Sequence, residues 1–285
     1  KILDSVELGI GMLRHYRSWA PSADEDLEWS AAEVTPKKPI PFLVPGPELD
    51  TTYSWRLDGV VKKRSDDTYW AFEHKTCRSI EEKKAMLAND EQAPTYLWAT
   101  QELLGYKLSG IIYNLMRKKV PTAAVWLKNG NGFSQNKAMD TTFDYYKSQL
   151  DEVAAEQADS DAKLQGIDTE EAWSHFYKAH KDFLYSTHKE MLEHLYQKGN
   201  TFFERYELRR TQQQIAQARY ELKMVVLDMV DPYIYKNGGR PQCNWCPFRD
   251  PCLVLEADGD YAEVLDRYYQ PRQPYKEVFY EQVEE

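Results

Sequence analysis

Three residues of this chain, Asp58, Glu73 and Lys75, have types and spacing that would bring two carboxylates and an ammonium group to one point. Glu73 and Lys75 fall on the same face of an expected strand, because successive side chains of a strand point to opposite faces. Asp58 lies in a mostly apolar neighbouring segment, residues 56–61, where a carboxylate is costly unless it is paired or bound to a metal. The pattern therefore indicates a catalytic or metal-binding group.

Metal-assisted hydrolysis of a phosphodiester bond is the chemistry that this group suits. Asp58 and Glu73 offer hard oxygen ligands for Mg²⁺ or Mn²⁺, and we expect the backbone carbonyl of His74 to complete the metal shell. A metal held there lowers the pKa of a bound water, while Lys75 positions the nucleophile or stabilises charge. The alternative is an exposed hairpin that carries an ordinary Glu–Lys pair.

The next expected helix adds Gln92 and Tyr96, which are four residues apart and so share one helix face. The ordered set of Asp58, then Glu73-x-Lys75, then Gln92-x-x-x-Tyr96 resembles the RecB-like branch of the PD-(D/E)xK nucleases. Residues 113–118 are similar to the strand that follows in phage-type members of that branch.

The resemblance implies a metal-dependent DNA nuclease, expected to be an exonuclease in recombination, repair or phage DNA processing. Asp58 and Glu73 would bind the metal, and Lys75 would assist the nucleophile. Gln92 and Tyr96 would position the metal-bound water and the phosphate. The implied partners are DNA that is single-stranded or has free ends, and a recombination or replication protein.

Three of the four cysteines, Cys243, Cys246 and Cys252, crowd into ten residues. Thiolates at such spacing are typical of soft-metal ligation. The triplet resembles the C-terminal cysteines of the iron–sulfur subgroup of the same nuclease branch, which implies a [4Fe–4S] cluster. Zinc with a histidine as fourth ligand, or three unligated cysteines, are the alternatives.

In that subgroup a fourth cysteine precedes the catalytic hairpin, but no cysteine precedes Asp58 here. We expect the fourth ligand to lie upstream of Lys1 or to be replaced, and Cys77 is the remaining candidate. The alternative for Cys77 is a buried free thiol. Many relatives also use an upstream histidine as a metal ligand, and His15 is the candidate for that role.

Hydrophobic periodicity and turn residues predict the elements that must position these groups. Strand, helix and strand in succession imply an α/β core. The expected elements are a helix over 5–19, a proline-rich edge strand or loop over 29–44, a hairpin of 53–61 and 69–76, a helix over 90–104 ended by Gly105, a strand over 106–116, a loop over 129–142, a helical region over 143–197, and a helix to about Met229 that begins with the capping pair Thr211 and Gln214.

The resemblance covers residues 6–269 and implies a mixed central sheet flanked by helices. We expect one RecB-like nuclease domain over 1–285, with a helical insertion over 143–200 and a cysteine-rich cluster loop over 237–256.

Composition limits the function classes. The net charge of −10 argues against a nonspecific nucleic-acid coat but not against a carboxylate metal site with local basic clusters. No apolar run approaches the ~18 residues of a membrane span, and four cysteines are too few for a disulfide scaffold. We expect a soluble, cytoplasmic protein without a membrane partner. The competing functions are a catalytically inactive nucleic-acid-binding subunit and an RNA endonuclease.

Overall fold

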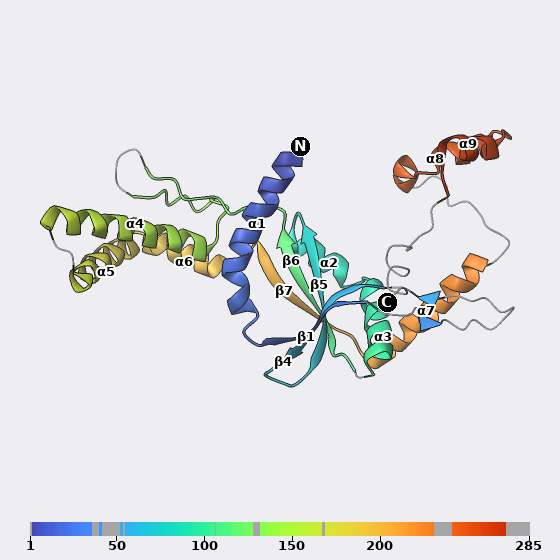
Figure 1. Cartoon of the computed structure of the whole chain (residues 1–285), viewed down its shortest axis with the longest axis horizontal. Helices are drawn as coiled ribbons and strands as arrows, with labels where there is room; N and C mark the ends of the chain where they lie inside the picture. The colour runs from blue at the N-terminus through green and yellow to red at the C-terminus, as the bar shows by residue number, and fades with distance from the viewer. Residues whose placement is uncertain are drawn as a thin grey trace, which may run out of the picture. The chain divides into compact units, whose positions relative to one another are not determined.

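A five-stranded mixed sheet forms the core of the fold (Figure 1), and Asp58, Glu73 and Lys75 lie on its strands. The computed structural model describes residues 2–35, 40–41, 52–53, 55–105, 107–127, 132–166, 169–230 and 241–271. The strand order is β1-β4-β5-β6-β7, with β5 and β6 parallel and the other neighbours antiparallel. The strands are β1 (Leu27–Val34), β4 (Leu57–Lys63), β5 (Tyr69–Cys77), β6 (Gly110–Arg117) and β7 (Phe203–Arg209). The prediction of an α/β protein with a mixed sheet and flanking helices is confirmed.

The predicted hairpin is strands β4 and β5, which pair antiparallel with Gly59 opposite Phe72. A turn closes it, in which the Lys63 amide donates to the Thr68 carbonyl at 2.8 Å. Apolar residues on both strands are fully buried, including Val61 and Trp70. The hairpin forms because each strand covers its neighbour with β-branched and aromatic side chains.

Helices cover both faces of the sheet. Strands β5 and β6 are parallel, so a crossover must join them, and the helices α2 (Ile80–Leu87) and α3 (Gln92–Leu104) form it. Glu73 pairs with Tyr113 and faces this crossover, whereas His74 faces the opposite side. Helix α1 (Ile2–Ala23) packs against β7 on that opposite side.

Helix ends explain why these elements stop where they do. Gly105 ends α3 in the left-handed conformation, φ 74°, and its amide donates to the Gln101 carbonyl at 2.9 Å. Helix α7 (Gln212–Val230) begins with the predicted capping box: the Thr211 amide donates to Gln214 Oε1 at 2.8 Å, and the Gln214 amide donates to Thr211 Oγ1 at 3.2 Å.

The predicted helical insertion consists of three helices, α4 (Phe143–Gln165), α5 (Glu170–Thr187) and α6 (Lys189–Lys198). They share a core of their own, because apolar residues recur at helical spacing along each of them. Its fully buried members include Tyr146, Leu150, Ala154, Met191 and Leu195.

The chain divides into two compact units by packing. The single nuclease domain over 1–285 stays a prediction. Unit 1 contains residues 1–34 and 56–218, and so holds the sheet and the insertion. Unit 2 contains residues 35–55 and 219–285. Its described elements are β2 (Ile40–Pro41), β3 (Thr52–Tyr53), the second part of α7, η1 (Pro241–Trp245), α8 (Arg249–Glu256) and α9 (Tyr261–Tyr268).

Some predicted features differ from the structure or lie outside the described residues. The segment predicted as a cysteine-rich loop contains η1 and α8 where it is described, and Cys252 closes a turn of α8 by donating its amide to the Phe248 carbonyl at 3.1 Å. Its first residues, 237–240, lie outside the described part, as does most of the turn at 129–132. Within the described residues, none of the helices is both long and apolar enough to span a membrane.

Candidate active site on strands β4 and β5

Asp58 extends the hairpin on the face of the sheet that carries Glu73. The backbone ladder between β4 and β5 ends at Gly59 and Phe72, so the register places Asp58 opposite Glu73. Its carboxylate oxygen Oδ2 accepts a hydrogen bond from the His74 amide at 2.7 Å. Asp58 is therefore held across the strand end by the backbone between Glu73 and Lys75.

Lys75 connects the carboxylate of Glu73 on strand β5 to helix α3. Its ammonium donates to Glu73 Oε1 at 2.8 Å and to Gln92 Oε1 at 2.9 Å. The amide nitrogen of Gln92 in turn donates to the Tyr96 hydroxyl oxygen at 2.8 Å. The sequence places these residues correctly: Gln92 and Tyr96 share one helix face, and that face meets Lys75.

Sequence reasoning missed a support for this arrangement, Asp90. The backbone amide of Gln92 donates to Asp90 Oδ1 at 2.9 Å, and the Tyr113 hydroxyl donates to Asp90 Oδ2 at 3.3 Å. Burial, with the charge of Asp90, raises the pKa of Tyr113 far above its ordinary value, so this hydroxyl stays a donor. An aspartate just before the first turn of a helix is a usual capping position, and that signal could have identified it.

Glu73 is the buried carboxylate of the site, with a side chain only 10% exposed. Burial raises its pKa, the charge of Asp58 acts in the same direction, and the bond from Lys75 opposes both. Its oxygen Oε2 is inaccessible to solvent and has no hydrogen-bond partner among the described residues. A buried acceptor without a partner is costly, which indicates that a further group belongs beside it.

The carboxylates of Asp58 and Glu73 have the donor chemistry that a hard divalent cation requires. Mg²⁺ keeps several waters and is commonly bound by one or two carboxylates together with a substrate phosphate. Asp58 and Glu73 supply such a pair. Among the described residues, no group of three or more His, Cys, Asp or Glu side chains is placed to hold a metal. The backbone carbonyl of His74 stays a predicted third ligand.

No protein-family model, curated protein or solved structure matches this chain. The contacts among its own residues therefore carry the functional argument.

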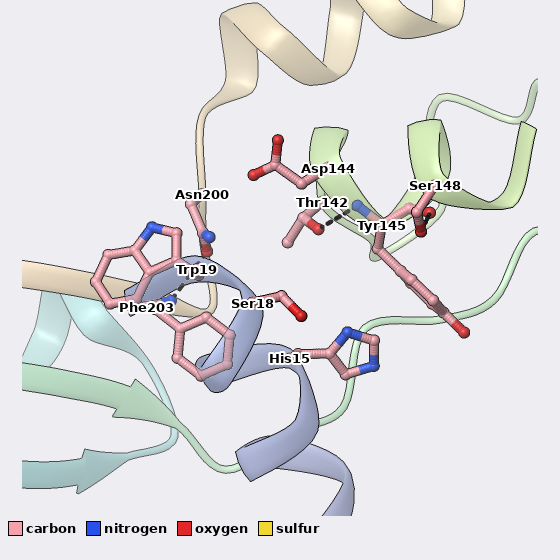
Figure 2. A pocket seen from close by; sticks show the side chains of 9 residues that line it. All are labelled: His15, Ser18, Trp19, Thr142, Asp144, Tyr145, Ser148, Asn200 and Phe203. Atoms are coloured by element: carbon pink, nitrogen blue, oxygen red, sulfur yellow. Dashed lines mark hydrogen bonds between the residues drawn. The ribbon is translucent and has the colours of Figure 1, made fainter. Parts of the chain in front are cut away.

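His15 lies away from these residues, in a cavity of about 110 Å³ that α1 lines together with the start of α4 (Figure 2). Its ring contacts the Tyr145 ring edge-on, with 4.3 Å between centroids. Burial lowers the pKa of His15. The next residue of α1, Tyr16, accepts a bond from Asn114, which lies on the opposite face of the sheet from Glu73. The structure does not bring His15 together with Asp58 and Glu73.

The side chain of His74 joins a polar network on this opposite face. The Asn114 amide nitrogen lies 2.6 Å from His74 Nδ1 and donates to the Tyr16 hydroxyl oxygen at 3.1 Å. Arg205 donates to Asn114 Oδ1 and to both carboxylate oxygens of Asp24, at 2.8 and 2.9 Å. Desolvation lowers the pKa of His74. Arg205, a basic residue suited to phosphate contact, is instead engaged in the fold.

None of the cysteines forms a disulfide. Cys77 is buried, its thiol lies 3.7 Å from the Met116 carbonyl, and burial raises its pKa. Cys246 is exposed, while Cys243 and Cys252 are half-buried. These three thiols are not gathered into a metal-binding group within the described residues. The iron–sulfur ligands, Cys77 included, stay predictions.

Proposed function

We propose that this chain is a Mg²⁺- or Mn²⁺-dependent nuclease that hydrolyses phosphodiester bonds of DNA. The observation that carries the proposal is the unsatisfied buried oxygen of Glu73, on a carboxylate that already shares its other oxygen with Lys75 and faces Asp58. Charged ligands such as a metal ion stabilise a buried carboxylate of this kind.

The metal, when bound by Asp58 and Glu73, would lower the pKa of a water ligand and neutralise charge on the phosphate. Lys75 has three N–H donors, and Glu73 and Gln92 take two of them. The third is left for a phosphate oxygen or for the attacking water. Developing negative charge on the phosphate would strengthen that contact, which is how a fixed donor accelerates a reaction.

Gln92 and Tyr96 act in this proposal as positioning residues. Gln92 accepts from Lys75 and donates to Tyr96, so the bond to the hydroxyl fixes which end of the Gln92 amide faces the ammonium. A lysine side chain otherwise has several rotamers of similar energy. Holding it in one of them keeps its third donor directed at the reacting group.

The proposed substrate and reaction follow from the family resemblance together with this geometry. DNA with single-stranded segments or free ends is the proposed substrate, with exonucleolytic cleavage as the mode. The competing functions are an inactive nucleic-acid-binding subunit and an RNA endonuclease. The intact contacts among Asp58, Glu73 and Lys75 favour an active site over a decayed one.

Digestion of end-labelled DNA and RNA of the same sequence, with Mg²⁺, Mn²⁺ or EDTA, tests the proposal. We expect DNA products that require the metal and that are absent with Glu73→Gln, which keeps the size of the side chain but loses the charged ligand. RNA products alone would favour the endonuclease alternative. Tight DNA binding without products in either metal would favour the inactive subunit.

A further inference from the structure

A second cavity, of about 430 Å³, lies beyond the end of strand β5 in unit 1. Its wall includes Arg78 and the start of α2, Arg117 at the end of β6, and the loop that leads from Lys198 at the end of α6 into β7. Three segments that are distant in sequence thus bring basic side chains to one hollow.

Two of these cations are not neutralised. Arg78 and Lys198 are exposed, and neither makes an ion pair with any described residue. Arg117 differs, because it donates to both carboxylate oxygens of Asp140 at 2.9 Å. Arg78 and Lys198 therefore give the cavity positive charge that no described carboxylate pairs with directly.

The acidic residues of the wall offset that charge only in part, because they share a lysine. Glu81 and Glu204 are the carboxylates that line the cavity. Lys84 pairs with Glu204 at 2.8 Å and with Glu81 at 3.4 Å. One ammonium beside two carboxylates leaves this group with one negative charge, against the two positive charges of Arg78 and Lys198.

Backbone groups at the start of α2 complete the wall. The Ser79 hydroxyl caps α2 by accepting from the Glu82 amide at 3.3 Å, which leaves the amides of Ile80 and Glu81 without a described acceptor. Amides at a helix start are common partners of phosphate oxygens.

The cavity lies on the same side of the sheet as the candidate active site. Cys77 pairs in parallel register with Arg117, so the Arg117 side chain shares the face of Glu73 and Lys75. Arg78 follows Lys75 by three residues, a separation of about 10 Å along an extended chain. A nucleic-acid strand held at Lys75 would pass within reach of Arg78.

We propose that this cavity binds a phosphate group of the DNA strand whose scissile bond lies at Asp58, Glu73 and Lys75. Arg78 and Lys198 supply the charge, and the start of α2 supplies hydrogen-bond donors. The inference rests on the proposed function for the identity of the strand. It adds a binding site, outside the metal site, that fixes the register of the strand on the enzyme.

The test compares two double variants that remove the same charge. Arg78→Gln with Lys198→Gln removes the two cavity cations, whereas Lys163→Gln with Lys178→Gln removes two exposed cations of the α4–α5 pair. Binding of a fluorescent linear single-stranded DNA is measured in EDTA at several salt concentrations. A circular single strand is used as a competitor, to distinguish a backbone phosphate from a terminal one.

The cavity variant is expected to bind about tenfold more weakly than the parent and the control. Its plot of log K against log salt should be less steep by about 0.7, because the loss of one phosphate contact on a single strand removes about that much from the slope. The charge-conserving pair Arg78→Lys with Lys198→Arg should keep the parent slope. If the circle competes as well as the linear strand, the phosphate belongs to the backbone, and if it does not, the phosphate is terminal.

Equal affinity and equal slope for the cavity and control variants would overturn the inference. Cleavage by the parent is measured separately with Mn²⁺, so the two proposals fail in different ways. If the parent cleaves DNA and both double variants bind DNA equally well, the nuclease proposal is supported and the phosphate site is contradicted. If the parent does not cleave DNA, but the salt dependence of DNA binding is weaker in the cavity variant than in the parent, the phosphate site is supported and the nuclease proposal is contradicted.

Discussion

At the scale of single residues, the buried carboxylate of Glu73 sets the character of the candidate site. It shares one oxygen with Lys75 and leaves the other without a partner among the described residues. Desolvation makes the charged form costly, and a bound cation or the neighbouring ammonium compensates for that cost. Glu73 should therefore respond to pH and to metal differently from an exposed glutamate.

The first prediction concerns the pH dependence of stability without metal. Burial raises the pKa of Glu73 in the folded protein above its unfolded value, so between the two values the folded state binds more protons. The free energy of unfolding should then fall as pH rises through this window. Thermal unfolding in EDTA should show this decline for the parent and a smaller one for Glu73→Gln.

Metal affinity should change in the opposite direction. Protons compete with Mn²⁺ for the Glu73 carboxylate, so the affinity of the protein for Mn²⁺ should fall as pH decreases through the raised pKa. Titration calorimetry measures this affinity. Identical pH profiles of stability for the parent and for the Glu73→Gln variant would contradict the assignment of Glu73 as the desolvated carboxylate.

The second prediction concerns Tyr96, which accepts the bond from Gln92. Tyr96→Phe removes only the hydroxyl and frees the Gln92 amide to rotate away from Lys75. We expect kcat to fall about tenfold, the usual scale for an outer partner of a metal site, with KM little changed. Tyr196→Phe, at an exposed position of α6, is the control. A loss of equal size in both variants would rule out a specific role for Tyr96.

At the scale of elements, the sequence predicts well those segments whose apolar residues follow a simple period. The hairpin, α3 and the capped start of α7 are examples, because alternation, a terminal glycine and a capping pair are local signals. Strand β7 lacks such a signal, because charged residues interrupt its apolar pattern. One of them, Arg205, pairs with Asp24, which is distant in sequence. Helix α2 was missed because it has eight residues and buries only Ile80 and Leu87.

The candidate site divides in the same way. The strand period places Glu73 and Lys75 on one face, and the helix period places Gln92 and Tyr96 on one face. The contact between Lys75 and Gln92 is a long-range feature that those periods do not give. Nor do they give the cavity beside Arg78, because it depends on the β6–β7 register and on where α6 ends, which are long-range features.

The third prediction belongs to strand β7. Arg205→Ala leaves Asp24 without its bidentate partner, and it also removes a donor to Asn114. The two charged side chains are only 10% and 24% exposed, so the loss of unfolding free energy should be about 3 kcal/mol. Arg209 is an exposed arginine of the same strand β7, and its guanidinium lies over the Trp70 ring of β5. The Arg209→Ala substitution should lower the free energy of unfolding by less than about 1 kcal/mol. Urea denaturation measures both, and equal losses would contradict a buried network.

At the scale of the whole molecule, the chain consists of two packed units, and the chemistry predicted for them differs. Unit 1 holds the carboxylates, Lys75 and the basic cavity, whereas unit 2 holds the cysteine triplet. The net charge of −10 does not favour general attachment to nucleic acid. Strand binding would therefore depend on local positive charge such as that of Arg78 and Lys198.

The fourth prediction concerns the cysteine triplet. If Cys243, Cys246 and Cys252 hold an iron–sulfur cluster, protein purified without oxygen should be brown and contain iron and sulfide. Cys246→Ser should lose both, and Cys77→Ser should lose them only if Cys77 is the fourth ligand. Zinc in place of iron would support the alternative site, and stable metal-free protein would remove the cluster.

The central claim is that Lys75, held by Glu73 and Gln92, completes a metal-dependent nuclease site, and cleavage of end-labelled DNA by Lys75→Ala tests it most directly. The control is Lys181→Ala, which removes another partly buried lysine that is paired with a carboxylate, Asp151 at 3.3 Å. We expect Mn²⁺-dependent cleavage by the parent and by Lys181→Ala, and none by Lys75→Ala, whose DNA affinity in EDTA should stay nearly intact. Equal cleavage by all three proteins would contradict the account.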